Sequence, residues 1–320
     1  THCASTMAGR LYGWANGSDI YAIKIFDTDA FGVSASFNMI RGWHNNKGNN
    51  RPTVVNMSWG YFGTYTNITG GNYRGTPWTG ATQQTAYGMV FGNTNNNGDW
   101  THPVRITSVE SDMEDCITDG VILVGAAGNS QHKMDLTTGL DYNNYFTNNF
   151  GNRYYHRGGT PQAATDTICV GAIDYTYQTG TQERCATFTE KGPRVDIFAP
   201  GYAIQAAIPQ SATLSTNTAT YPTNSSYKIR KLQGTSMACP QVAGIVATLL
   251  QARPDYTPQQ CMAWIQDQAV NNRLYDPTVG TSADYTNNRA LQTANNKYLQ
   301  TPFVSGEPKK FSGGIQFSTS

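Results

Sequence analysis

The sequence has 320 residues, a net charge of +1 and a charged fraction of only 13%, against the roughly 25% usual in soluble domains. This near-neutral balance gives no strongly basic surface, so we predict neither a nucleic-acid nor an anionic-membrane partner. No apolar run approaches the roughly 20 residues that a membrane-spanning helix needs. A hydrophobic fraction of 38% is adequate for the core of one large α/β domain or two small ones.

The predicted elements alternate between strands and helices along the chain. Short apolar runs indicate buried strands, and apolar positions three and four residues apart indicate amphipathic helices. In chain order these are a strand at 21–26, a helix from 33 to about 47, a strand at 53–57, a helix around 109–117, strands at 121–127, 168–173 and 195–199, and helices at 236–252 and from 258. Such alternation predicts an α/β fold with a mostly parallel sheet and helices on both of its faces.

Three segments are polar and lack a clear period, at 61–101, 131–166 and 301–320. We expect the first two to be long loops that border a substrate site or contact a neighbour. The last is expected to be a tail, which leaves residues 1–300 as the main domain.

The six cysteines form no Cys-x-x-Cys pair, so we predict no zinc site and assign neither disulfides nor a redox compartment. Three of them lie within apolar patterns and are expected to be buried thiols, namely Cys116, Cys169 and Cys239. No cofactor or metal is predicted, because calcium would need a diagnostic ligand spacing. That spacing is missing from the candidate oxygen ligands Asp27, Asp29, Asp135 and Asp141.

The segment 234–244, Gly-Thr-Ser-Met-Ala-Cys-Pro-Gln-Val-Ala-Gly, is the most informative part of the sequence. It places Ser236 in the first turn of an apolar helix, where backbone N–H groups are free and the partial charge is positive. A serine oxygen there can attack a carbonyl group while the N–H groups receive the developing negative charge. The alternative is an ordinary cap at the start of a packed helix.

A second candidate, Asn129, follows the apolar strand at 121–127 in the sequence Gly-Ala-Ala-Gly-Asn-Ser. Ligand sites of parallel sheets gather at the carboxyl ends of the strands. A side-chain amide at that edge can donate to an oxyanion. Taken alone, the residue is better interpreted as a turn position that tolerates left-handed backbone.

Together these motifs resemble those of the subtilisin-like serine proteases, the subtilases, from residue 1 to about 270. Segments 170–174 and 196–201 match family segments too, and 56–60, Asn-Met-Ser-Trp-Gly, resembles the strand along which an extended substrate lies. The resemblance implies a subtilisin-like fold with Ser236 as nucleophile, and with the Asn129 side chain and the Ser236 N–H as oxyanion donors. It also implies substrate binding by Ser58, Trp59 and Gly60.

Two positions depart from the family pattern. Trp59 stands where the family has a smaller apolar residue, and it either narrows a substrate site or packs against the following insertion. Gln241 stands where many members have histidine, and we interpret it as a variant on the helix surface.

The first nine residues resemble the second part of the family's histidine motif. The resemblance implies that the catalytic histidine lies two positions before Thr1, that His2 is the second, structural histidine, and that the aspartate motif and an N-terminal strand lie upstream. No motif surrounds the other histidines, which we expect on the surface or in loops: His44, His102, His132 and His156.

The sequence therefore predicts a serine endopeptidase that acts on peptide or protein substrates through an acyl-enzyme. Its histidine and aspartate would come from an upstream segment or a separate chain. The alternative is an inactive protease fold that serves as a structural or binding component of a virion or cell surface, because the low charge and Asn/Thr/Gly/Tyr-rich loops are typical of such proteins. Either role favours an extracellular or virion-associated location.

Overall fold

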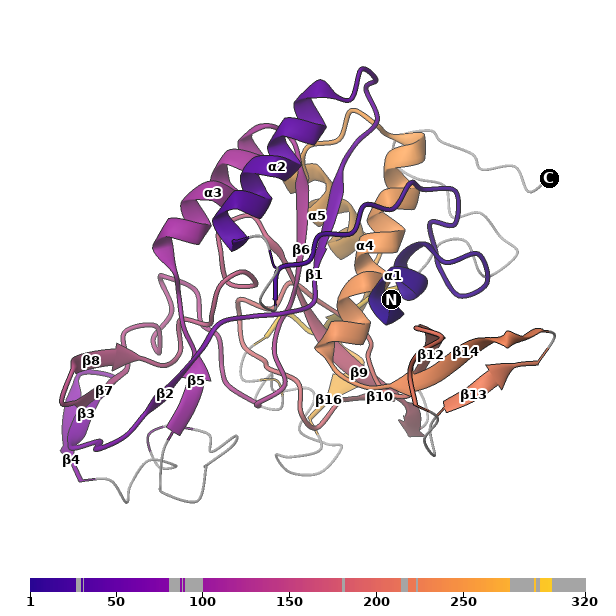
Figure 1. The fold of residues 1–320 in the computed structure, drawn as a ribbon. Coiled ribbons are helices and arrows are strands. Elements are labelled where there is room, and N and C mark those ends of the chain that lie inside the picture. Colours follow the sequence, from indigo (N-terminus) through magenta and orange to yellow (C-terminus); the bar gives the residue numbers. More distant parts are fainter. Residues whose placement is uncertain are drawn as a thin grey trace.

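The computed structural model describes residues 1–26, 30, 32–80, 87, 89, 100–179, 182–213, 218–222, 224–276, 291 and 294–300. Its centre is a mainly parallel sheet (Figure 1), in which β1, β6, β9, β11 and β17 run parallel, in that order. These strands are β1 Val54–Met57, β6 Ile122–Ala126, β9 Ile168–Thr179, β11 Ile197–Pro200 and β17 Lys297–Tyr298. The antiparallel β15, Val270–Asn271, closes the far edge, and β10, Gln182–Cys185, links β9 to β16, Leu274–Tyr275.

Helices cover both faces of this sheet. On one face lie α2, Val33–Asn46, and α3, Thr107–Thr118; on the other lie α4, Thr235–Ala252, and α5, Pro258–Asp267. The short helix α1, His2–Ala8, packs against α4. This two-layered cover confirms the predicted α/β architecture (Figure 1).

The alternation of side chains along β6 explains why two helical layers form. Ile122 and Val124 belong to the core beneath α4, whereas Leu123 belongs to the core beneath α3. All three side chains are buried, because successive residues of a strand point to opposite faces. A strand that is apolar at every position must therefore be covered on both sides.

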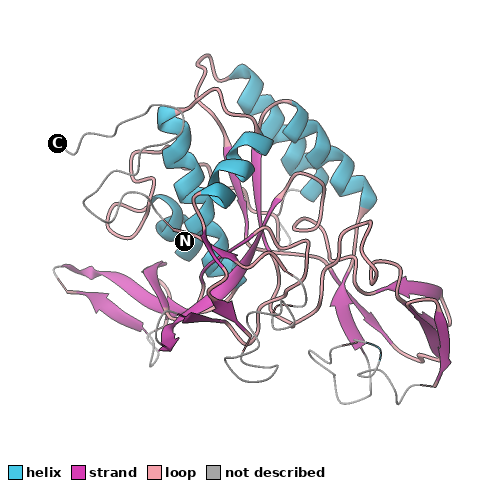
Figure 2. Cartoon of the chain, turned by 180° about the vertical axis from the view of Figure 1, so that it is seen from behind, coloured by secondary structure: helices cyan, strands magenta, loops and turns pink. Residues whose placement is uncertain are grey.

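Two of the segments expected to be loops contain β-structure instead. The strands β2 Phe62–Tyr65, β3 Gly70–Tyr73, β4 Thr76–Thr79, β5 Trp100–Pro103, β7 Tyr145–Asn148 and β8 Gly151–Tyr154 form two small sheets, which we call the arm. The arm has its own core, in which Trp100, Phe146 and Tyr155 are buried. A three-stranded sheet of β12 Ile204–Ile208, β13 Thr218–Tyr221 and β14 Asn224–Leu232 projects from the opposite side, as the view from behind also shows (Figure 2).

The expected strand at 21–26 is wrong. These residues are extended but pair with no described strand, and Ile20, Tyr21 and Phe26 are exposed. The segment packs against α2 instead of pairing in a sheet: Tyr21 contacts Trp43 with ring centroids 5.5 Å apart. Without a neighbouring ladder an extended segment is not a strand.

The remaining predictions concern termini, thiols and membranes. The expected tail at 301–320 lies outside the described residues. Cys116, Cys169 and Cys239 are fully buried, as predicted, and all six cysteines are free thiols. Among the helices of the described ranges, none combines the length and apolarity needed to span a bilayer.

Candidate active site

Ser236 is the second residue of α4 and lies where the carboxyl ends of β1 and β6 meet that helix. Its side chain is half-buried although the residues around it are buried. The Oγ atom donates a hydrogen bond to the carbonyl oxygen of Ser58 at 3.1 Å. The Ser236 N–H is one of the first N–H groups of the helix, which have no acceptor within the helix.

Pro240 frees the backbone carbonyl of Ser236. In a regular helix that carbonyl accepts from the N–H of residue 240, which proline lacks. The carbonyl accepts instead from Ser58 Oγ at 3.0 Å and Cys3 Sγ at 3.3 Å. The proline of the motif therefore allows α1 and the segment after β1 to hydrogen-bond directly to the serine turn.

The amide of Asn129 is fixed by the residue that precedes the serine. Its Oδ1 accepts from the Thr235 N–H at 2.8 Å and from Thr235 Oγ1 at 3.1 Å. Thr235 Oγ1 in turn accepts from the Gly128 N–H at 3.1 Å. Because Oδ1 is occupied, the Nδ2 group, a donor, is the end of the amide left to face a ligand. Asn129 is exposed, so this donor is accessible.

Gly234 marks the space between the two expected oxyanion donors. A Cβ atom placed on it would lie 3.5 Å from Asn129 Nδ2 and 3.6 Å from the Ser236 nitrogen. Its φ of 143° also falls in a region that favours glycine. An oxygen atom near this point can accept from both groups, and a side chain at position 234 would intrude on it.

The three substrate-binding candidates follow β1 directly and are half-buried. Ser58 presents its carbonyl oxygen to Ser236 Oγ, as described above. The ring of Trp59 packs edge-on against Phe26 and Tyr61, at centroid distances of 6.0 and 5.7 Å. Gly60 faces the side chain of Gln162, whose Oε1 would be 3.1 Å from an added Cβ.

No histidine of this chain reaches Ser236. The buried His2 ring lies between β12 and β14, with Nε2 3.1 Å from the carbonyl oxygens of Ile204 and Arg230. The ring of His44 contacts Thr53. The remaining three, expected on the surface or in loops, are all buried in or beside the arm core. His132 and His156 do lie in loops, whereas the expectation is wrong for His102, which belongs to β5.

Sequence reasoning misplaced Gln241 and missed two contributors. Gln241 is buried rather than on the helix surface, because it accepts from Trp14 Nε1 at 2.8 Å and donates to the Pro200 carbonyl at 3.2 Å. Thr235 and Cys3 were not proposed. Thr235 adjoins the serine in the motif, which is a usable signal, whereas Cys3 approaches only through the docking of α1 on α4.

The candidate calcium ligands are occupied by the chain itself. Arg74 and Lys133 each donate to Asp141 at 2.6 Å, and Asp135 accepts from the backbone of Leu136 and Asp141. Burial raises the pKa of Asp141, but the hydrogen bonds from Arg74 and Lys133 outweigh it and hold this pKa well below its usual range. Asp27 and Asp29 lie outside the described residues, and within those described no group of three or more acidic, histidine or cysteine side chains is arranged to hold a metal.

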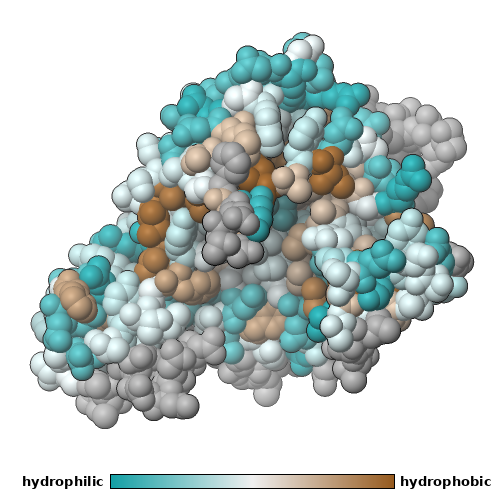
Figure 3. Space-filling model, in the orientation of Figure 1, coloured by the Kyte–Doolittle hydropathy of each residue, from teal (hydrophilic) through white to brown (hydrophobic). Residues whose placement is uncertain are grey.

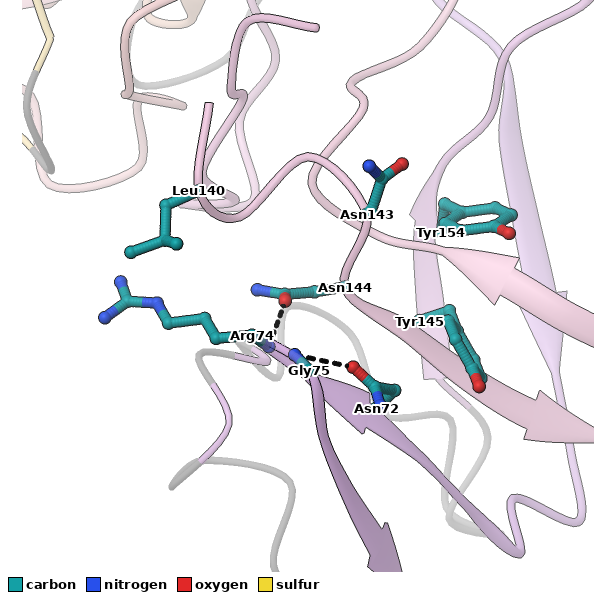
Figure 4. Close-up of a pocket in the computed structure, with 8 residues that line it drawn as sticks. All are labelled: Asn72, Arg74, Gly75, Leu140, Asn143, Asn144, Tyr145 and Tyr154. Carbon is teal, nitrogen blue, oxygen red and sulfur yellow. Dashed lines mark hydrogen bonds between the residues drawn. The ribbon is translucent and has the colours of Figure 1, made fainter. Parts of the chain in front are cut away.

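A separate pocket lies on the arm and contains none of the candidate catalytic residues. Figure 4 shows the side chains of Asn72, Asn144 and Tyr145 around it, with Arg74 and Gly75 donating backbone hydrogen bonds to the two asparagines at 2.7 and 2.9 Å. The Oδ1 atoms of these two asparagines are thus already occupied by backbone donors.

Comparison with known proteins yields one consistent family. The model of the subtilase family matches residues 1–300. The chain is 26% identical over 277 residues to subtilisin-like protease 2 of Pseudogymnoascus destructans, covering 87% of this chain and 48% of that protein. It is 27% identical over 293 residues to an extracellular serine proteinase of a Thermus species, covering 92% and 50%. The chain thus spans about half the length of the curated relatives it matches.

The fold is also found in a solved structure. The crystal structure of a cold-adapted subtilisin-like serine proteinase superposes with a TM-score of 0.53 at 20% sequence identity, covering 93% of this chain and 72% of that one. At this level of identity the match shows the subtilisin-like fold.

Proposed function

Because this chain belongs to the subtilase family, we propose that it carries the nucleophile and oxyanion site of a serine endopeptidase. The observation that carries the proposal is the placement of Asn129 Nδ2 and the Ser236 nitrogen around one point beside the serine, 3.5 and 3.6 Å from the Cβ position of Gly234. Two converging donors next to a hydroxyl are what acyl transfer requires.

The chemistry follows from this geometry. An extended peptide lies along Ser58–Gly60 by strand addition, with its scissile carbonyl oxygen directed at the two donors. Ser236 Oγ attacks the carbonyl carbon and gives up its proton to a base. The two N–H groups donate hydrogen bonds to the oxygen and stabilise its negative charge. Collapse expels the amine, which takes the proton, and water then hydrolyses the acyl-enzyme by the same route.

We further propose that the base comes from a residue outside these 320. The contacts of the five histidines support this, since none of them hydrogen-bonds to Ser236. The Ser236 Oγ donates instead to the backbone carbonyl of Ser58. The helix α1 approaches the site, because Cys3 contacts the Ser236 carbonyl. A residue attached just before this helix would be well placed to reach the serine.

The open edge of the sheet supports the same proposal. Within the described ranges β1 pairs with β6 alone, and three of its four residues are only half-buried, unlike the fully buried β6. The unpaired segment 20–26 exposes Tyr21 and Phe26 nearby, and apolar surface is visible around the middle of this face (Figure 3). An added strand at this edge would satisfy the free N–H and C=O groups of β1.

Labelling with a fluorophosphonate probe tests the nucleophile. The intact protein from its native source is expected to form a covalent adduct at Ser236, located by peptide mass spectrometry. Ser236→Ala should abolish the adduct, whereas Ser226→Ala, on the exposed β14, should retain it. Absence of labelling in the intact protein would favour the structural role.

A second comparison tests the origin of the base. The isolated 320-residue chain is expected to label far more slowly than the intact protein, by up to about a millionfold, the loss that subtilisin shows on removal of its histidine. Equal rates would mean that the base lies within these residues, and would overturn this part of the proposal.

A further inference from the structure

Two buried side chains close to the active site have acceptor oxygens that lack partners. Glu190 is fully buried, and neither of its carboxyl oxygens has a hydrogen-bond partner in the described part of the chain. Gln162 is 1% exposed, and its Oε1 is unpartnered in the same sense. Most buried polar groups are satisfied, so three unpaired acceptors in one region need an explanation.

Both side chains adjoin the segments that would hold the substrate. The Glu190 carboxyl lies against Gly128, where an added Cβ would clash with Oε1. Gln162 donates from Nε2 to the Ala127 carbonyl at 3.3 Å and turns Oε1 towards Gly60. One side chain therefore abuts the loop that leads to Asn129, and the other abuts the substrate-binding segment after β1.

Neither Lys191 nor Lys133 pairs with Glu190. Lys191, the next residue, forms an ion pair with Asp276, and Lys133 is paired with Asp141 and Asp135. Burial raises the pKa of Glu190 well above its usual value. The ionised form of this carboxyl carries a large desolvation cost, which a cation able to donate several hydrogen bonds would offset, so that binding of the cation favours ionisation.

We propose that Glu190 and Gln162 form the base of the subsite for the substrate side chain just before the scissile bond, and that they select lysine or arginine there. A peptide with its carbonyl at Asn129 and Ser236 and its backbone along Ser58–Gly60 directs that side chain between Gly60 and Gly128, the two glycines against which the Gln162 and Glu190 oxygens lie. Ammonium and guanidinium groups carry donors and no acceptors. They complement three acceptor oxygens, whereas an apolar side chain leaves all three unpaired.

This inference rests on the proposed endopeptidase activity, and one experiment separates the two. Peptidyl diphenyl phosphonates that differ only in the residue analogue next to phosphorus (lysine, glutamine or leucine) are reacted with the intact protein, and the second-order rate of Ser236 labelling is measured. The lysine analogue is expected to react at least tenfold faster than the leucine analogue. If no analogue labels Ser236, the proposed function fails rather than the subsite.

Variants then assign the preference to Glu190. Glu190→Gln should lower the ratio of lysine to leucine rates at least tenfold, whereas Glu114→Gln, the same change at an exposed position of α3, should leave the ratio unchanged. Labelling of the unmodified protein decides the matter even if Glu190→Gln does not fold. Faster labelling by the leucine or the glutamine analogue, or an unchanged ratio in Glu190→Gln, would overturn the inference.

Discussion

Asn129 Oδ1 accepts two hydrogen bonds from Thr235, one from the backbone N–H at 2.8 Å and one from the hydroxyl at 3.1 Å. The residue before Ser236, the proposed nucleophile, thus fixes the orientation of the amide that would hold the oxyanion. Thr235 is 1% exposed and also accepts from Gly128 N–H at 3.1 Å. The serine turn and the loop after β6 are therefore one hydrogen-bonded unit.

Asn129→Ala should lower kcat by about 100- to 1000-fold, the range found when subtilisin loses its own oxyanion asparagine. The substrate's ground-state contacts lie elsewhere, so KM should change little. Steady-state kinetics of peptide hydrolysis by the intact protein provide the measurement.

Thr235→Val removes the hydroxyl that joins Gly128 to Asn129 and should also lower kcat, by less than Asn129→Ala, because the backbone N–H of residue 235 still binds Oδ1. Thr235→Ser retains the hydroxyl and serves as the control. Equal kcat values for Thr235→Val and the unmodified protein would show that the amide needs no such support.

Cys3 should be the one thiol that reacts rapidly with a disulfide reagent in the native protein. It is half-buried, whereas the other five cysteines are fully buried. Burial raises the pKa of Cys116, Cys185 and Cys261 to about 12, which suppresses the reactive thiolate. Titration with Ellman's reagent before unfolding counts the accessible thiol, and titration after unfolding counts the buried ones as well.

Modification of Cys3 should also slow the labelling of Ser236, because its Sγ lies 3.3 Å from the Ser236 carbonyl oxygen. Cys3→Ser should eliminate the fast thiol and make labelling insensitive to the reagent. Two or more rapidly reacting thiols in the folded protein would contradict the burial pattern.

The arm should lose stability in mild acid because of its buried histidines. Burial lowers the pKa of His102 to about 4 and that of His132 to about 3, from 6.5 when unfolded. Below pH 6.5 the unfolded chain binds more protons than the folded one, so the free energy of unfolding falls as the pH falls. The loss is at most about 1.4 kcal/mol per pH unit for each ring, and it stops below the folded pKa.

Urea unfolding at several pH values between 7.5 and 4.5 measures this slope. His102→Phe keeps an aromatic ring against Tyr65, whose centroid is 5.0 Å away, and should reduce the slope. Tyr65→Phe introduces no titrating change and should leave the slope as it is. An unchanged slope in His102→Phe would show that His102 does not cause the loss of stability in acid.

Replacing one member of the buried Lys191–Asp276 ion pair should cost more unfolding free energy than replacing both. Both side chains are almost completely buried. Asp276→Leu removes the carboxylate that is paired with a buried ammonium group and should cost about 3–5 kcal/mol of unfolding free energy. The double variant Lys191→Met with Asp276→Leu should recover much of this loss, as measured by denaturant unfolding. If its loss of unfolding free energy equals the sum of the losses in the two single variants, the two residues are not coupled and the prediction is wrong.

The elements of the central domain were predictable because their signals are local. The apolar run at 121–127 contains β6, and the helix expected at 236–252 is α4 to within one residue. The helix from 258 begins with the capping box of Thr257 and Gln260. The segment 21–26 had the composition of a strand, but a strand also needs a partner, which composition does not encode. The arm strands escaped prediction because their glycine- and asparagine-rich sequences gain stability only from a shared aromatic core.

The sequence by itself determined the family and the α/β class and singled out Ser236 and Asn129 as candidates, because the serine motif and the loop around Asn129 are short continuous strings. Only the tertiary structure decided how these residues meet. Thr235 orients Asn129 across 106 positions of sequence, Cys3 reaches Ser236 across 233, and Glu190 lies unpaired behind Gly128. Such relationships depend on the packing of distant segments and on which buried groups find partners. No local pattern of residue types specifies either.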